Sequence, residues 1–215
     1  MSITLLRKAF LSAAMALLFS ASTSGFSMHA HAAASEEDQQ GAVAFFQEMS
    51  DAAFAVMRNT QLSKDEQKAE FRRLFKKGTA VEQLGPLLLG YHRKRFSAEQ
   101  LKRYTDLLPD YVVAIYTDRL FDVGNEEVSI QNTYTQGSSD VWIVTKVTSP
   151  IGGDDLRADW RIRRLDSGRF SLLDVKVENI SLFQTKKDEF MAYLGRRGIE
   201  AFLKRLSEDV AKASS

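Results

Sequence analysis

The segment SLLDVKVENISLFQTKKDEF, residues 171–190, changes its hydrophobic period from two to that of a helix within a few residues. Apolar and polar side chains alternate as far as Val177, which predicts a β-strand with one buried face. Apolar residues then follow at helical spacing, and Ser181 with Gln184 has the pattern of a capping box. We therefore interpret Ser181 as a helix cap rather than a nucleophile, and the junction as scaffold that folds a helix back across the end of a sheet.

Three segments before this strand share its period of two. They are rich in β-branched and aromatic residues, and the sequences QGSSD, SPIGGDD and DSG between them have the composition of tight turns. Because short turns join neighbouring antiparallel strands, the simplest topology is a four-stranded antiparallel meander. The predicted strands cover residues 128–134, 140–150, 156–163 and 169–178.

Helical patterns lie on both sides of this predicted sheet. Amphipathic spacing and capping signals predict N-terminal helices over residues 38–59, 63–78, 79–91 and 97–120. The third is interrupted at Gly85 and Pro86, and the last is kinked or divided at Pro109. After the sheet, Gly195 and Gly198 separate two C-terminal helices. We therefore expect an α+β fold whose helices pack on one face of the sheet.

The first residues have the organisation of a secretory signal peptide. Arg7 and Lys8 precede the apolar run AFLSAAMALLFSA, and AHAAA supplies small residues at a cleavage zone. The apolar run is too short to cross a bilayer comfortably, and no later segment approaches that length. We therefore predict a signal peptide over residues 1–34 and a single mature domain over residues 35–215.

Net charge bears on the kind of partner that the protein can bind, and cysteine content bears on how its fold is stabilised. Loss of Arg7 and Lys8 with the signal leaves 27 of 29 basic residues against 28 acidic ones, a mature net charge of −1. This balance gives no general attraction to nucleic acid, and we expect no nucleic-acid partner. The chain has no cysteine, so its fold depends on its core rather than on disulfides.

The residues needed for most catalytic and metal sites are scarce. Only one of the three histidines, His92, remains after the predicted cleavage, and we interpret it as a surface or loop residue. A nucleophile–histidine system or a zinc site needs residues that the mature chain lacks or has once. We therefore expect no enzyme, no metal and no cofactor.

The chain has 14 Phe, 6 Tyr, 2 Trp and 6 Met, many of them on the periodic faces described above. These side chains could fill a solid core, or they could line an apolar cavity for a hydrophobic ligand. Periodicity predicts both equally, so the two interpretations stay open at this point.

The chain resembles the MlaC or toluene-tolerance family of periplasmic lipid-binding proteins. The resemblance covers about residues 40–207 and rests on LLLGYHRKRFSAEQLKRY, ADWRIRRLDSGRFSLLDVKVENISLFQTKKDEF and GIEAFLKRL. Its most specific part is an aromatic residue followed by DV, Glu, SL and a closing Phe, here Phe170 to Phe190. The sequence departs from the family at Asn179, where Gly is usual, and at Lys186, where Tyr is usual.

The resemblance implies a monomeric periplasmic carrier that holds a lipid in an apolar cavity between sheet and helices. Such a carrier moves lipid between an inner-membrane ABC transporter complex and an outer-membrane lipoprotein and porin complex, and so serves the lipid asymmetry of the outer membrane. A phospholipid is the favoured ligand, and a hopanoid is the alternative because relatives encoded with hopanoid biosynthesis belong to the same superfamily. A non-enzymatic envelope scaffold with a solid core and a carboxylate-dependent hydrolase remain the competing hypotheses.

On this reading we predict that the cavity is lined by apolar and aromatic residues of the long helix and of three strands. The predicted lipid-binding residues are Leu108, Tyr111, Val112, Ile115, Trp142, Val144, Trp160, Ile162, Leu173, Val175 and Val177. An arginine run could bind a lipid phosphate, or it could form the solvated face of an amphipathic strand. This run consists of Arg161, Arg163, Arg164 and Arg169.

Overall fold

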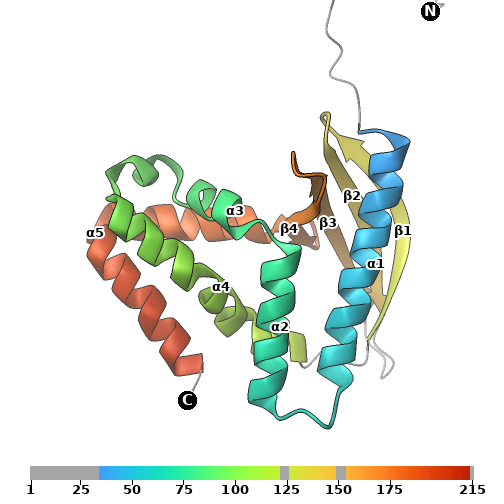
Figure 1. The fold of residues 1–215 in the computed structure, drawn as a ribbon, viewed down its shortest axis with the longest axis horizontal. Helices are drawn as coiled ribbons and strands as arrows, with labels where there is room; N and C mark the ends of the chain where they lie inside the picture. Colours follow the sequence, from blue (N-terminus) through green and yellow to red (C-terminus); the bar gives the residue numbers. More distant parts are fainter. Residues whose placement is uncertain (1–33, 122–125, 149–153, 214–215) are drawn as a thin grey trace, which may run out of the picture. The chain divides into compact units, whose positions relative to one another are not determined.

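An antiparallel sheet with its strands in chain order forms the β part of the fold (Figure 1). The predicted four-strand meander is confirmed, and a two-residue strand, β5, adds to the end of it. The strands are β1 (Glu127–Gln136), β2 (Asp140–Thr148), β3 (Leu156–Arg164), β4 (Phe170–Val177) and β5 (Ile180–Ser181).

The computed structural model describes residues 34–121, 126–148 and 154–213. All of these residues belong to one compact unit, His31–Ser215. The predicted signal peptide lies outside the described residues except for Ala34, so it stays a prediction.

The helices are α1 (Glu36–Arg58), α2 (Lys64–Gly78), α3 (Val81–Leu88), the 3₁₀ helix η1 (Gly90–Arg95), α4 (Ala98–Phe121) and α5 (Leu182–Ala213). The backbone of α5 leaves the helical conformation at Gly198, with φ 78° and ψ 177°, so the predicted separation into two C-terminal helices is correct. The α+β class is thereby confirmed.

Capping signals located most helix starts. Ser63 with Glu66 and Ser97 with Gln100 form the predicted capping boxes. The start predicted at Thr79 is wrong, because its hydroxyl donates 2.7 Å to the Phe75 carbonyl and so helps to end α2. The predicted division at Pro109 is also wrong, since α4 continues through this residue.

One face of the sheet, called the inner face here, packs against α1 (Figure 1). The buried contacts join Ala42 and Phe46 of α1 to Val141, Ile143 and Ile162 of the sheet. The four largest of these side chains are at most 6% exposed. Val141, Ile143 and Ile162 all lie on this face, because only alternate residues of a strand reach α1.

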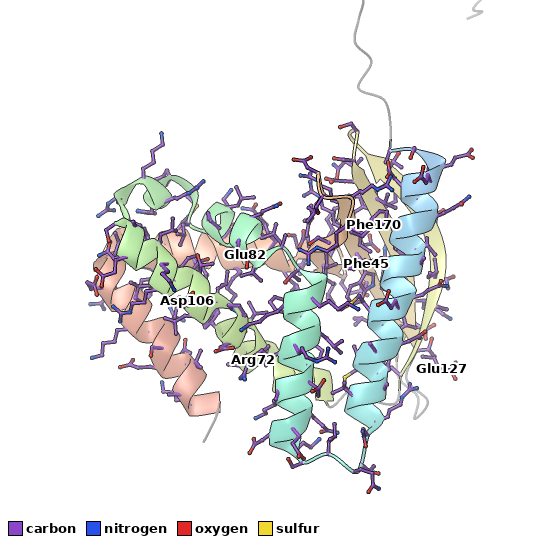
Figure 2. The ribbon with its side chains drawn as sticks, viewed as in Figure 1. Phe45, Arg72, Glu82, Asp106, Glu127 and Phe170 are labelled. Carbon is purple, nitrogen blue, oxygen red and sulfur yellow. The ribbon has the colours of Figure 1, made fainter. Side chains whose placement is uncertain are left out.

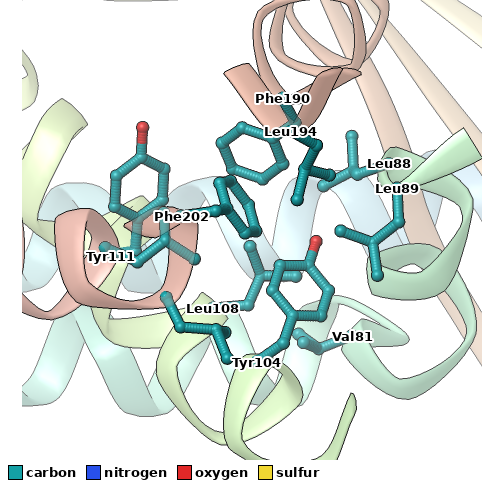
Figure 3. Close-up of a cluster of buried hydrophobic side chains, with 11 residues drawn as sticks. Val81, Leu88, Leu89, Tyr104, Leu108, Tyr111, Phe190, Leu194 and Phe202 are labelled. Atoms are coloured by element: carbon teal, nitrogen blue, oxygen red, sulfur yellow. The ribbon is translucent and has the colours of Figure 1, made fainter. Parts of the chain in front are cut away.

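A second core lies among α3, α4 and α5 (Figure 3). Tyr104 and Leu108 of α4 pack with Phe190, Leu194 and Phe202 of α5. The Tyr104 hydroxyl donates 2.9 Å to the Gly85 carbonyl, so this buried polar group is satisfied. The two buried clusters share no residue, and the fold therefore has two cores rather than one.

The outer face of the sheet carries a charged network. Asp140 accepts hydrogen bonds from Arg161 and Arg163, with Arg163 Nη2 3.0 Å from Asp140 Oδ2. The Asp140 side chain is only 4% exposed. Burial alone would raise the pKa of Asp140, but the hydrogen bonds from Arg163 and Arg161 outweigh it and leave the pKa below its usual value.

We predict that Asp140→Asn lowers the free energy of unfolding at neutral pH by about 1–2 kcal/mol, because charged hydrogen bonds are lost from partly screened guanidinium groups. A carboxylate whose pKa is lowered by folding stabilises above its unfolded pKa, near 3.8, and this stabilisation disappears as the pH falls through the folded value. Urea unfolding at several pH values should therefore show the difference at pH 7 and none in strong acid. Asp155→Asn, at an exposed ion pair with Lys146, is the control and should change little. Equal effects of the two substitutions would contradict this account.

The junction between β4 and α5 is held by the carboxylate of Asp174. It accepts a 2.6 Å hydrogen bond from the Ser181 hydroxyl and a 3.0 Å hydrogen bond from the Phe183 amide. The Ser181 oxygen in turn accepts a 2.9 Å hydrogen bond from the Gln184 amide. The predicted helix cap at Ser181 is thus confirmed. Two left-handed residues, Glu178 and Asn179, with φ 48° and 66°, form the turn before it.

We predict that Asp174→Ala destabilises the protein by about 2–3 kcal/mol, because it removes the acceptor of both the cap hydroxyl and a helix N-terminal amide. Thermal unfolding followed by circular dichroism measures the loss. Asp166→Ala changes the same residue type in the exposed turn between β3 and β4, where no described residue donates a hydrogen bond to that carboxylate. Its melting temperature should stay near that of the unchanged protein. A melting temperature for Asp174→Ala equal to that of the control would disprove the role of this carboxylate.

Candidate functional site

The inner face of the sheet is uncharged where β3 and β4 pair. Trp160 lies opposite Val175, Ala158 opposite Val177, and Ile162 opposite Leu172. Because alternate residues share a face, the neighbouring β2 positions on this side are Val141, Ile143 and Thr145. The Thr145 hydroxyl donates 2.7 Å to the Ala158 carbonyl, which leaves an apolar surface.

Part of this apolar face is incompletely covered. Trp160, Val175 and Val177 are only partly buried, whereas Ile143 and Ile162 beside them are at most 1% exposed. We call these three residues the β4 strip. Trp160 lies at the margin of the sheet core that α1 covers, whereas Val175 and Val177 lie on β4, the strand next to α2 and α5. Partly exposed apolar side chains between two cores are the expected lining of a site for an apolar ligand.

The boundary of α1 on this face is marked by aromatic packing. Phe45 of α1 and Phe170 of β4 lie side by side in Figure 2, with ring centroids 6.3 Å apart. Phe46 packs on Trp160 with centroids 5.2 Å apart. A side chain at Gly41 would collide with the Phe170 ring, so the glycine permits α1 to approach β4 closely.

The predicted helix residues divide into two groups. Leu108 and Tyr111 are 3% and 2% exposed and belong to the helical core. Val112 and Ile115 are partly buried and pack against the margin of that core. Phe183 of α5 is also partly buried and packs against this core, and the sequence interpretation missed it. Leu108 and Tyr111 therefore support the helices, while the marginal residues are the better candidates for contact with a ligand.

The predicted strand residues lie on both faces of the sheet. Ile162 is buried in the sheet core, and Leu173 is a partly buried residue left unpaired at an irregularity of β4. Trp142 and Val144 alternate with the inner residues and so lie on the outer face. The structure therefore does not bring these two together with the β4 strip.

Trp142 has its own packing on the outer face. Its ring stacks with Tyr134 at a centroid distance of 6.1 Å, and the Lys176 ammonium lies 3.9 Å from its centroid. Its indole nitrogen donates 2.8 Å to Gln136. These contacts leave Trp142 only 2% exposed. Every sequence position in the VWIV run of β2 is apolar, so alternation there could not indicate which residues face inward.

The arginine run is held by contacts within the protein. Arg161 and Arg163 bind Asp140, and Arg164 binds the acidic first turn of α1 at 3.0 Å and 3.3 Å. Arg169 donates 3.3 Å to a backbone carbonyl at the end of α2. These contacts favour a structural role for the run over a role as a preformed phosphate site.

A polar cluster joins α4 to α5 near the helical core. Lys186 Nζ lies 2.7 Å from Glu189 Oε2 and 3.4 Å from the Tyr111 hydroxyl, and Arg205 binds Glu189 at 3.0 Å. Burial, followed by the charge of Glu189, raises the pKa of Tyr111. Lys186, which departs from the family pattern, is therefore neutralised by a carboxylate of its own helix.

One hollow at the sheet has charged residues in its walls. It has a volume of about 330 Å³ and lies beside the ends of β1, β2 and β3. Lys146, Asp155, Arg157 and Glu178 contribute to its walls. A charged wall of this kind does not suit an acyl chain, so this hollow is not the apolar site.

The described residues offer little catalytic chemistry. His92 is 3% exposed and its Nδ1 accepts a 3.0 Å hydrogen bond from Arg95 Nη1, so the expectation that it lies at the surface is wrong. Across residues 34–121, 126–148 and 154–213, no group of three or more His, Cys, Asp or Glu side chains could hold a metal ion. In the same part of the chain, no helix is long and apolar enough to cross a bilayer.

Comparisons with known proteins agree with this geometry. A solved structure of the phospholipid-binding protein from Ralstonia solanacearum, in complex with a phospholipid, superposes with a TM-score of 0.69. It is 17% identical, and the match covers 81% of this chain and 99% of that one. A search of curated proteins finds no match. The sequence model of the family described as MlaC protein matches residues 47–208, and the chain therefore belongs to the MlaC family.

Proposed function

We propose that this protein is a periplasmic carrier that binds a phospholipid by its acyl chains and moves it between the two membranes of the envelope. The observation that carries the proposal is the β4 strip, an uncharged and incompletely covered apolar surface between two separate cores. Membership of the MlaC family and the phospholipid complex of the structural relative support the same ligand class.

The physical need for such a surface follows from the hydrophobic effect. Each methylene removed from water gains about 0.8 kcal/mol, so an acyl chain of about fifteen methylenes resists transfer through water by about 12 kcal/mol. An apolar surface without buried charges can replace the bilayer for these chains. The polar head group would stay near solvent, where it keeps its hydration.

Carriage of this kind makes and breaks no covalent bond. The proposal therefore requires no catalytic residue, and energy would come from partner complexes. We propose an inner-membrane ABC transporter complex and an outer-membrane lipoprotein and porin complex as these partners, with the protein acting as a monomer. A hopanoid is the alternative ligand, because an apolar surface does not by itself distinguish acyl chains from fused rings.

We predict that the exported protein, purified without added lipid, contains phospholipid at close to one molecule per chain. Extraction with organic solvent and mass spectrometry identifies the lipid and its amount. A hopanoid in the extract would replace the phospholipid assignment. Reproducibly empty protein would favour the scaffold hypothesis and contradict the proposal.

We predict that Val175→Trp reduces bound lipid about five- to a hundredfold, because overpacking of the strip costs about 1–3 kcal/mol of ligand affinity. Val177→Trp should act in the same direction. Val144→Trp is the matched control, since it places the same ring on the outer face at a partly buried valine. Lipid content is measured on folded variants with unchanged circular dichroism. If Val144→Trp lowers lipid content and Val175→Trp does not, the site lies on the other face.

A further inference from the structure

The helical part of the protein exposes a group of basic residues outside the proposed lipid site. Arg93, Lys94 and Arg95 lie in η1, and Arg196 and Arg197 lie in α5 just before its break at Gly198. All five side chains belong to exposed residues. We call this group the basic patch.

The two segments of the basic patch are neighbours in space. A Cβ added at Gly195 would lie 3.9 Å from the His92 ring, and one at Gly90 would touch Met191. Figure 1 shows η1 beside the turn of α5. His92 is buried and pairs with Arg95 within η1, which holds the Arg95 side chain in place.

Charge in the basic patch is not neutralised, in contrast to that of Arg161 and Arg163 on the sheet. Arg93, Lys94, Arg196 and Arg197 have no carboxylate within ion-pair distance in the part of the chain that the structure describes, and Arg95 binds only His92. The nearest carboxylate in sequence to Arg197 is Glu200, and it is already bound by Arg103. With Glu99 at the start of α4 included, the five cations of the patch still leave an excess of positive charge.

Large apolar side chains accompany these cations. Tyr91 is 67% exposed and lies two residues before Arg93, and Leu87 near the end of α3 is 53% exposed. The Tyr91 ring lies 4.2 Å from that of His92, which supports it from below. Exposure of a tyrosine and a leucine beside five cations is an arrangement that neither the sheet core nor the helical core requires.

We propose that the basic patch docks the protein on an anionic lipid bilayer. Lys and Arg side chains near such a surface gain about 1 kcal/mol each, and tyrosine favours the boundary between head groups and acyl chains. A bilayer, unlike an acidic protein, needs no shaped partner, which suits long flexible cations that are not held in a pocket. This docking goes beyond lipid carriage and does not depend on it.

The test uses the exported, purified protein and its variant Arg93→Gln with Lys94→Gln. Sedimentation with vesicles of phosphatidylglycerol and phosphatidylethanolamine should show binding that neutral phosphatidylcholine vesicles lack. The variant should bind about thirtyfold more weakly, as expected when two cations of about 1 kcal/mol each are removed. Raising the salt from about 50 mM to about 300 mM should weaken the unchanged protein more than the variant, because screening acts on the charges.

The matched control is Lys76→Gln with Lys212→Gln, which removes two exposed cations elsewhere and changes the net charge equally. Binding should survive in this control. An equal loss in both double variants would show that net charge alone acts, and failure of the unchanged protein to bind anionic vesicles would overturn the proposal. The proposal would also be overturned if the basic patch were needed to bind an acidic protein while the unchanged protein did not bind anionic vesicles.

Two further measurements separate this proposal from the others. Tyr91→Ser should reduce vesicle binding at high salt as well as at low salt, because its contribution is apolar. Lipid content of the Arg93→Gln, Lys94→Gln variant should equal that of the unchanged protein. Protein that contains no lipid but binds anionic vesicles would refute lipid carriage and support docking. Protein that contains lipid but does not bind anionic vesicles would refute docking and support lipid carriage.

Discussion

The carboxylate of Asp174 fixes the angle at which the sheet passes into the last helix, and the helical core depends on that angle. It accepts hydrogen bonds from the Ser181 hydroxyl and the Phe183 amide. The short strand β5 and the first turn of α5 therefore share one acceptor. From this point α5 carries Phe190 and Phe202 into the helical core. An unsatisfied helix N-terminus here would leave both the direction of α5 and the surface beside β4 undetermined.

This arrangement explains why the apolar face stays incompletely covered. α1 fills the sheet core above Ile143 and Ile162, while α5 leaves β4 and commits its apolar side chains to α3 and α4. Trp160, Val175 and Val177 therefore belong fully to neither core. A solid core would bury them and gain stability, because protein interiors are normally close-packed. Loss of that gain is the cost expected of a surface kept for a ligand.

Local signals in the sequence predicted where helices and turns lie better than they predicted which side chains become buried. The turns between β1 and β2 and between β3 and β4, and the caps at Ser63, Ser97 and Ser181, depend on nearest neighbours, and the structure agrees with them. The predicted turn SPIGGDD lies mostly outside the described residues. Trp142 shows the limit of such reasoning, because an apolar run carries no information about which side of a strand will be covered. His92 shows another limit, since its burial comes from contact between η1 and α5, about a hundred residues apart in the chain.

The distribution of charge separates the two surfaces of the protein by role. On the outer face of the sheet, Arg161 and Arg163 both bind Asp140, so their charges join β2 to β3. Because Asp140 partly neutralises them, these arginines attract an external partner less strongly. At η1 and the turn of α5 the cations lack such partners among the described residues, and their field extends into solvent over about a Debye length. A nearly neutral chain therefore presents a local positive field at this place, because several cations lie together there without a carboxylate partner among the described residues. Electrostatic attraction at that place is reversible, which suits a protein that must leave a membrane as readily as it reaches one.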